Sequence, residues 1–244
     1  MSANSTWRGT ARPDAGQLLV SEVFGPTLQG EGPSAGRAAS FVRLGGCNLA
    51  CSWCDTSYTW DATRHDLRTG LTVQNTQEVA AQVLSIGAPL VIITGGEPAL
   101  QAAEATRLAG LLTAGGAAVE LETAGTVPLG PLAEQVRLVV ISPKLASSGV
   151  PLRARLRWDV LAAAAGLPHA VLKFVVQDCG DLVEADEVVG RLGTAPDRVW
   201  VMPEGTTAAT VLDRMADLAE PVARRGWSLS SRLQVLLWGD QRGR

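Results

Sequence analysis

Short runs of β-branched and aliphatic residues alternate with alanine-rich segments of helical period, and this alternation constrains the fold more than any other feature. Runs that are apolar throughout are typical of strands covered on both faces, as in a parallel sheet flanked by helices. We predict strands at residues 18–24, 39–45, 89–95, 118–123, 136–142, 170–176, 198–203 and 233–238. We predict helices, each closed by a glycine at or shortly after its end, at residues 75–87, 100–114, 153–165, 180–191 and 206–225.

The number of strand–helix units limits the kind of barrel that the chain can form. A complete (β/α)8 barrel takes about 250 residues, and about 200 at the least. The chain has 244 residues, and its first strands are used by a hairpin-like start and a long loop, with a polar irregular segment at 59–72. We therefore predict an α/β fold, an incomplete and laterally open (β/α) TIM-like barrel. Residues 17–244 would form its single domain, and residues 1–16, which are polar and small, a flexible tail.

Charge and hydropathy exclude several classes of partner. The net charge is −3 and has no long run of one sign, which argues against a nucleic-acid surface and against electrostatic attachment to a membrane. No apolar run approaches the roughly 20 residues that a spanning helix needs. The N-terminal residues lack the apolar centre of a secretion signal, and we expect a cytoplasmic protein, since the cytosol keeps thiols reduced.

Three cysteines, Cys47, Cys51 and Cys54, follow the predicted strand 39–45 and a Gly-Gly pair with the spacing C-x3-C-x2-C. Three thiolates on one loop can hold three corners of a [4Fe–4S] cluster, because cysteine is the normal ligand of such clusters. The fourth iron then keeps an open position, as working metal sites do. The loop therefore predicts an iron–sulfur cluster that binds a further ligand.

A zinc site in a non-enzymatic interaction module is the alternative. Zinc usually takes four ligands, often as two separated pairs. The chain has no second pair, since His65 and His169 are isolated and Cys179 is the only distant candidate for a fourth ligand. This pattern favours the cluster over zinc.

Three further motifs stand at predicted strand exits, where barrels of this kind carry their chemistry. They are TGGEP (94–98), ETAGT (122–126) and SPK (142–144). Two glycines at a strand exit allow the backbone to approach a ligand closely. Each motif alone could be an ordinary turn, and Glu122 could be a buried carboxylate that accepts only from backbone donors.

The cysteine spacing followed by TGGEP resembles the radical S-adenosylmethionine (SAM) enzymes. The combination of LQGEG (28–32), FVRLGGCNLACSWCDT (41–56) and MPEG (202–205) is narrower and resembles the 7-carboxy-7-deazaguanine synthase family across residues 18–244. The resemblance implies a barrel of the radical SAM type. It also implies conversion of 6-carboxy-5,6,7,8-tetrahydropterin to 7-carboxy-7-deazaguanine with loss of ammonia, in queuosine (7-deazapurine) biosynthesis. The reaction would start with a 5′-deoxyadenosyl radical made from SAM.

The resemblance also assigns residues. The cluster would be held by Cys47, Cys51 and Cys54, and a Mg²⁺ ion by Thr56. The pterin site would contain Leu28, Gln29, Gly30, Glu31, Arg43 and Thr94. SAM would contact Trp53, Cys54, Asp55, Gly96, Ser142, Pro143 and Lys144. Because the cofactor generates the radical, no catalytic residue is certain, and Glu31 and Glu122 are candidates for proton transfer.

The resemblance implies an external one-electron donor of the flavodoxin or ferredoxin type and a homodimer. A glycyl-radical activase is the alternative enzyme; it would need a docking face for a large protein, and LQGEG, Arg43 and Thr56 argue against it. The sequence leaves open the donor's identity, the oligomeric state, the role of the C-terminal tail, and whether the product serves tRNA modification or a secondary metabolite.

Overall fold

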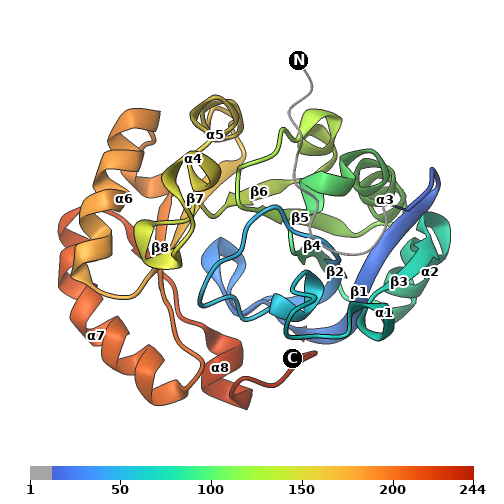
Figure 1. Ribbon diagram of the computed structural model, residues 1–244, viewed down its shortest axis with the longest axis horizontal. Coiled ribbons are helices and arrows are strands. Elements are labelled where there is room, and N and C mark those ends of the chain that lie inside the picture. The colour runs from blue at the N-terminus through green and yellow to red at the C-terminus, as the bar shows by residue number, and fades with distance from the viewer. Residues whose placement is uncertain (1–12) are drawn as a thin grey trace.

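The strands form one open sheet in a computed structural model that describes residues 13–244 (Figure 1). Its order is β3-β1-β2-β4-β5-β6-β7-β8-β9. The strands are β1 (Gln17–Leu28), β2 (Ala38–Leu44), β3 (Thr72–Asn75), β4 (Leu90–Gly95), β5 (Ala118–Thr123), β6 (Leu138–Ile141), β7 (Ala170–Val176), β8 (Val199–Pro203) and β9 (Ser228–Leu229). The strand β1 is antiparallel to its neighbours and every later pair is parallel. Since β3 and β9 remain as separate edges, the prediction of an incomplete, open barrel is confirmed.

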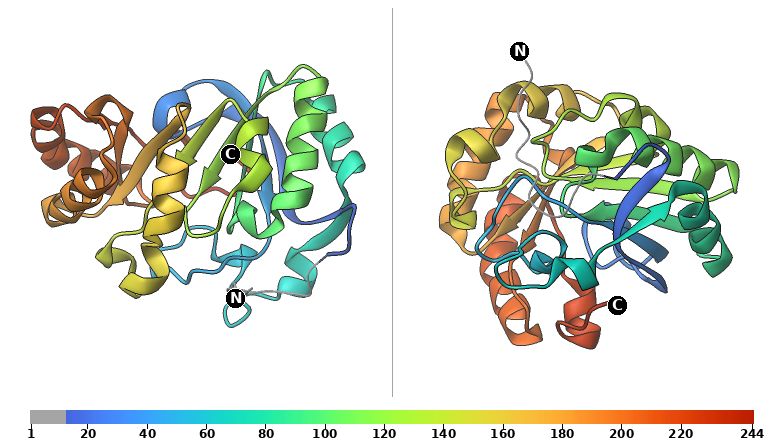
Figure 2. Two further views of the ribbon diagram at one scale, coloured as in Figure 1. Left: turned by 90° about the horizontal axis from the view of Figure 1, so that it is seen from above. Right: turned by 45° about the vertical axis from the view of Figure 1, so that its right-hand side comes forward.

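The longer helices lie around the outer side of the curved sheet (Figures 1 and 2): α2 (Thr76–Ile86), α3 (Ala102–Ala114), α5 (Trp158–Ala165), α6 (Cys179–Leu192) and α7 (Ala208–Arg224). The short helices are α1 (Leu67–Gly70), α4 (Leu152–Arg155) and α8 (Leu233–Trp238). Asn75 caps the start of α2, since its side chain accepts from the Gln77 N–H at 2.8 Å. Within residues 13–244, no helix is long and apolar enough to cross a membrane.

Two predicted elements are wrong, and a third segment is more ordered than expected. The run 233–238 is the helix α8 rather than a strand, because it lies beyond the sheet edge and buries one side through Val235 while Leu237 is exposed. The predicted helix 153–165 is interrupted after α4, where the buried Arg155 donates to the Lys144 carbonyl at 3.0 Å. The segment read as an irregular loop contains α1 and the start of β3.

The sheet separates an apolar outer layer from an interior that is partly polar. In β5, Val119 and Leu121 belong to the main core between the sheet and its helices. Glu120 and Glu122 alternate with them and therefore fall on the opposite face, which is the inside of the barrel. Lys173 alternates in the same way on β7. The polar interior is thus contributed by single residues within otherwise apolar strands.

A loop between β1 and β2 joins the two sides of the open barrel. Its 3-10 turn (Gly32–Ser34) places Ser34 inside, where the hydroxyl donates to Glu120 of β5 at 2.6 Å. The Gly32 N–H donates to Ser230, just after β9, at 2.7 Å, and the Gly30 carbonyl accepts from Leu233 at 3.0 Å. This bridging loop contains LQGEG and carries its side chains into the barrel.

The predicted tail, residues 1–16, lies mostly outside the described residues. Residues 13–16 lead into β1 through a turn in which Gln17 donates to the Asp14 carbonyl at 3.1 Å. The Gly16 N–H donates to Glu104 of α3 at 2.8 Å.

Candidate functional site

A cavity of about 430 Å³ opens at the carboxyl ends of the strands. Its wall includes residues at or just after the ends of β4, β5, β6, β7 and β8, as expected for a barrel of this kind. The structure brings almost all sequence-predicted site residues together here, since the cavity is lined by Leu28, Gln29, Gly30, Glu31, Arg43, Cys47, Cys51, Trp53, Cys54, Asp55, Thr56, Thr94, Gly96, Glu122, Ser142 and Lys144. Pro143 is buried beside the cavity and does not line it.

The three predicted cluster ligands share one small apolar group. Cys47 and Cys51 are buried and pack with Trp60, against which Cys54 also lies. The Trp60 indole N–H donates to the Cys54 sulfur at 3.4 Å. Burial raises the pKa of the Cys47 and Cys51 thiols, and the neighbouring thiols raise it further. Buried thiolates of this kind need a cation, which a bound metal supplies as it displaces the protons.

The donor set fits the expected [4Fe–4S] group. Cys47, Cys51 and Cys54 lie together on one loop and line the cavity, and cysteine thiolates are the normal ligands of such clusters.

The cluster loop is fixed by the loop after β6. The Ser52 N–H donates to the Ser148 carbonyl at 2.9 Å, and the Trp53 indole N–H donates to the Ser147 carbonyl at 3.1 Å. The Lys144 ammonium lies 5.7 Å from the centre of the Trp53 ring and donates to Ser142 at 2.7 Å. The SPK motif and the CSWCD segment thus form one continuous wall.

The TGGEP motif packs its backbone directly on the cluster loop. The Gly96 N–H donates to the Leu44 carbonyl at 3.0 Å, and the Glu97 N–H donates to the Gly46 carbonyl at 2.9 Å. A Cβ atom at Gly96 would lie 2.0 Å from the Gly46 oxygen. Only glycine permits this approach, so close packing alone accounts for this residue type.

Glu97 ties the end of β4 to the end of β5. Its carboxylate is fully buried and accepts from Ala99 N–H at 3.0 Å, Ala124 N–H at 2.8 Å and the Thr123 hydroxyl at 2.8 Å. Burial raises the pKa of Glu97 despite these donors. Glu97 therefore stabilises the junction of β4 and β5 and does not bind a ligand, since its oxygens already accept hydrogen bonds and it does not line the cavity.

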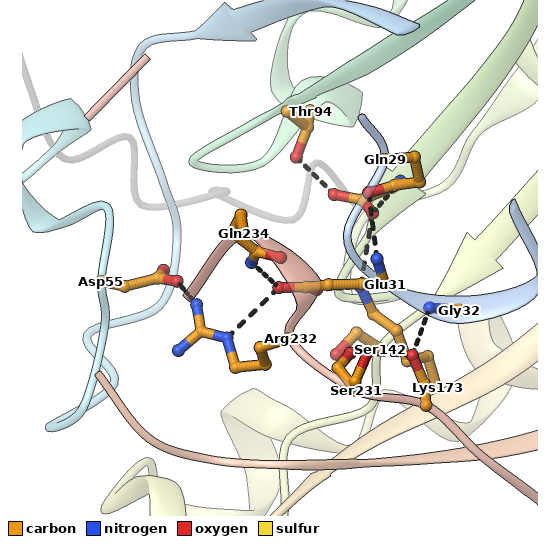
Figure 3. A network of polar contacts seen from close by, with 12 residues as sticks. Gln29, Glu31, Gly32, Asp55, Thr94, Ser142, Lys173, Ser231, Arg232 and Gln234 are labelled. Carbon is orange, nitrogen blue, oxygen red and sulfur yellow. Dashed lines mark hydrogen bonds and ion pairs between the residues drawn. The ribbon is translucent and has the colours of Figure 1, made fainter. Parts of the chain in front are cut away.

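A polar network also lines the cavity (Figure 3). The Lys173 ammonium lies 2.7 Å from Glu31 Oε2 and 3.3 Å from Glu122 Oε1. Thr94 donates to Glu122 Oε2 at 2.8 Å, and the Gln29 amide donates to Glu122 Oε1 at 3.3 Å. The bridging loop and the strands β4, β5 and β7 therefore meet at two carboxylates and one ammonium.

The segment after β9 completes this network. Glu31 Oε1 accepts from the Gln234 amide at 2.7 Å and from Arg232 Nε at 3.3 Å. Arg232 also pairs with Asp55 of the cluster loop. The Gln234 amide oxygen is buried and has no partner among the described residues. An unpartnered acceptor beside a cavity fits a ligand that brings an N–H donor.

Sequence reasoning did not select Lys173, Arg232 and Gln234. One signal was present for Lys173, because a lysine within an otherwise apolar strand needs a buried partner. Arg232 and Gln234 lie beside or within the run 233–238, which its apolar residues predict as a strand, so the sequence does not place them at the cavity.

The charge of Glu31 is set by its neighbours. Burial would raise the pKa of its carboxyl, but the nearby charges of Lys173 and Arg232 lower it from its ordinary value of 4.5 to about 2. Near neutral pH, Glu31 is therefore an acceptor only. Conversely, the carboxylates of Glu122 and Glu31 outweigh burial and raise the pKa of Lys173.

Replacing Glu31 with Gln should make stability less sensitive to acid. A carboxylate whose pKa is lowered by folding stabilises the protein above its unfolded pKa, and this contribution is lost as the pH falls through its folded pKa. The pKa values of 4.5 and about 2 set the window. We expect the difference in unfolding free energy between wild type and Glu31→Gln to be constant near neutral pH and to shrink inside that window. Urea unfolding of both cluster-free proteins measures it; a difference independent of pH would contradict the ion pairs.

Arg43 is held by an acid at the cavity rim. Its Nε donates to Glu22 at 2.6 Å, and Glu22 also accepts from the Tyr58 hydroxyl at 2.9 Å and from Arg242 at 2.8 Å. The guanidinium of Arg242 lies 4.2 Å from the centre of the Tyr58 ring. Residues 239–244 line the cavity, so the C-terminal tail reaches the site, a point that the sequence left open.

Thr56 lies next to the last cysteine of the cluster loop. Its hydroxyl is 3.6 Å from the Cys54 sulfur and makes no capping hydrogen bond to the following 3-10 turn. His65, His169 and Cys179 do not line the cavity.

Comparisons with known proteins agree with this geometry. Residues 41–145 match the model of the radical SAM superfamily. The chain is 35% identical to 7-carboxy-7-deazaguanine synthase of Rhodopirellula baltica, with 96% of this chain and 92% of that protein covered. It is 32% identical to the Bacillus subtilis protein of the same name, with coverages of 93% and 98%. The crystal structure of QueE from Escherichia coli has a TM-score of 0.68 at 28% identity, covering 88% and 93% of the two chains. Streptococcus suis SuiB shares the fold, with a TM-score of 0.52 at 14% identity over 76% of this chain and 46% of its own.

Proposed function

The chain belongs to the 7-carboxy-7-deazaguanine synthase family of radical SAM enzymes, and from this we propose that it converts 6-carboxy-5,6,7,8-tetrahydropterin to 7-carboxy-7-deazaguanine with release of ammonia. This is a carbon–nitrogen lyase reaction of queuosine biosynthesis. The observation that carries the proposal is a single cavity lined by both the three-cysteine loop and the Glu31–Lys173–Glu122 network. The cysteine loop suits the cofactors, and the polar network suits a polar heterocycle.

The cluster wall would hold the cofactors. Cys47, Cys51 and Cys54 would bind the [4Fe–4S] cluster. When bound, the cluster and SAM supply the one-electron chemistry that starts the reaction. Contacts to SAM would come from Trp53, Cys54, Asp55, Gly96, Ser142 and Lys144, with Pro143 fixing the backbone between the last two.

The polar network and the residues beside it would bind and orient the pterin. Glu31 would accept from the amino-pyrimidine edge, since an ionised carboxylate accepts from adjacent N–H donors. Arg43, whose Nε already donates to Glu22, has its terminal nitrogens left for the substrate carboxylate. The remaining contacts would come from Leu28, Gln29, Gly30 and Thr94. Apolar walls would keep water from the reacting atoms.

Glu31 and Glu122 are the candidates for proton transfer, and both line the cavity. The charges of Lys173 and Arg232 lower the pKa of Glu31, which favours its ionised form and a role in substrate recognition. Glu122, held by Thr94 and Gln29, is the remaining candidate.

Thr56 would supply a hydroxyl to Mg²⁺. A hard cation that keeps substrate oxygens and waters needs few protein ligands. Replacing Thr56 with Ala should weaken the dependence of turnover on Mg²⁺ while iron content stays unchanged. Titration of turnover with MgCl₂ measures this, and an unchanged Mg²⁺ response would reject the metal role.

The direct test of the function is product analysis. Anaerobically reconstituted protein should convert 6-carboxytetrahydropterin to 7-carboxy-7-deazaguanine in the presence of SAM, Mg²⁺ and a reductant. A brown protein that cleaves SAM but leaves the pterin unchanged would contradict the proposed reaction and leave only the assignment to the radical SAM superfamily.

In the cell, an electron donor of the flavodoxin or ferredoxin type would replace the reductant. We expect a cytoplasmic homodimer.

A further inference from the structure

Lysine is confined to the cavity in this chain. The sequence contains 19 arginines but only two lysines, Lys144 and Lys173, and both line the cavity. Every basic position elsewhere is arginine. The two residue types are not interchangeable, because lysine presents a compact point charge and arginine a wide planar fork. The distribution indicates that the cavity needs an ammonium group at these positions.

Lys173 is the more buried of the two. Its side chain is 5% exposed, and it lies on β7 between Leu172 and Phe174 of the main core. A buried charge is costly unless it is paired and hydrogen-bonded. Its two carboxylate partners meet this requirement, and they come from different parts of the chain: Glu31 from the bridging loop and Glu122 from β5.

The Lys173 ammonium connects two carboxylates, and each carboxylate also accepts hydrogen bonds from other side chains. Thr94 and Gln29 fix Glu122, while Gln234 and Arg232 fix Glu31 (Figure 3). Without Lys173, nothing among the described residues would join the two groups directly. The carboxylates would face each other across the cavity wall with no charge between them.

Space around the lysine stem also favours lysine. A Cβ atom at Gly32 would lie 3.7 Å from the Lys173 Cδ, so the stem runs in contact with the backbone of the bridging loop. The stem is therefore covered on this side, and the whole side chain is only 5% exposed. A guanidinium would need additional volume at the tip of the side chain.

We propose that Lys173 is a positioning residue that sets the distance between Glu31 and Glu122, so that both carboxylates meet the pterin as a fixed pair of acceptors. The inference rests on the proposed function, because the pair is argued to face that substrate. Lys173 itself need not touch the substrate. Its removal should weaken pterin binding while the cluster and SAM sites remain intact, because its two partners, Glu31 and Glu122, are assigned to neither of those sites.

The test uses reconstituted holoenzyme and the oxidised analogue 6-carboxypterin, whose fluorescence reports binding without turnover. The variants are Lys173→Met, which keeps the length of the side chain, and Lys173→Arg, which keeps the charge. A matched control is Arg137→Met. Arg137 pairs with Glu120, which lies on β5 two residues before Glu122, and neither Arg137 nor Glu120 lines the cavity.

We expect Lys173→Met to keep its iron content and SAM affinity and to bind 6-carboxypterin about tenfold to hundredfold more weakly, as loss of a charged hydrogen bond implies. Lys173→Arg should also bind it more weakly, and Arg137→Met should bind it as wild type does. During turnover, Lys173→Met should form more 5′-deoxyadenosine per product than wild type. A merely structural residue would not change this ratio.

Other outcomes decide against the inference. Wild-type affinity in Lys173→Met, or an equal loss in Arg137→Met, would overturn it while the proposed function stands. A wild-type protein that does not bind 6-carboxypterin would overturn the proposed function and this inference with it. If Lys173→Met does not fold, the double variant Lys173→Met/Glu122→Gln removes the unbalanced charge, and wild-type affinity in that protein would overturn the inference equally.

Discussion

Replacing Cys51 with alanine is expected to abolish cluster assembly and all turnover. The loop supplies only three thiolates, so loss of one leaves a second iron without a protein ligand. Cys51 is buried. The one cysteine outside the loop, Cys179, is exposed at the start of α6, where its sulfur lies 3.8 Å from the Asp217 carbonyl. Iron analysis should fall from about four irons per chain to near zero. Formation of 5′-deoxyadenosine should disappear with it.

The matched control is Cys179→Ala, since it also removes one thiol. This variant should retain the iron content, colour and turnover of the wild-type protein, because Cys179 does not line the cavity. A cluster that survives Cys51→Ala but is lost in Cys179→Ala would show that the ligand set has been assigned wrongly.

Replacing Glu97 with alanine should cause the largest loss of folding stability among the predicted variants. The carboxylate satisfies two buried backbone N–H groups and the Thr123 hydroxyl at the junction of β4 and β5. Each buried donor left without a partner costs about 1–3 kcal/mol, so we expect a loss of about 3–5 kcal/mol. Chemical unfolding of the cluster-free protein measures this loss. Iron content should also decrease, because the Glu97 N–H is bonded to Gly46 of the cluster loop.

Glu104→Ala is the control for Glu97. Glu104 also accepts from a backbone N–H and a threonine hydroxyl, those of Gly16 and Thr76, but it lies nearer the surface, where water can replace the lost acceptor. We expect a loss of about 1 kcal/mol. Equal losses of stability in the two variants would mean that burial does not raise the cost of removing the Glu97 carboxylate.

The sequence predicts the parts of the site that are formed by one short segment. The spacing of Cys47, Cys51 and Cys54 and the glycines of TGGEP are local patterns, and their tight backbone geometry depends on residue type. The open sheet also followed from counting strand–helix units, since a barrel needs a minimum number of them.

The sequence was insufficient where distant elements determine the outcome. A short apolar run such as 233–238 fits a helix or a strand equally well by periodicity. The break before α5 depends on Arg155 reaching the Lys144 carbonyl, a contact that no local pattern encodes. Lys173 and Arg232 meet Glu31 only after the bridging loop has crossed the barrel.

The loop that presents Glu31 also fastens β5 to the segment after β9, through Ser34 and Gly32. Substrate recognition and the joining of distant strands therefore depend on the same short loop. A change of substrate preference at this loop will carry a cost in thermal stability, and a bound pterin should slow amide hydrogen exchange in β5 and in the segment after β9.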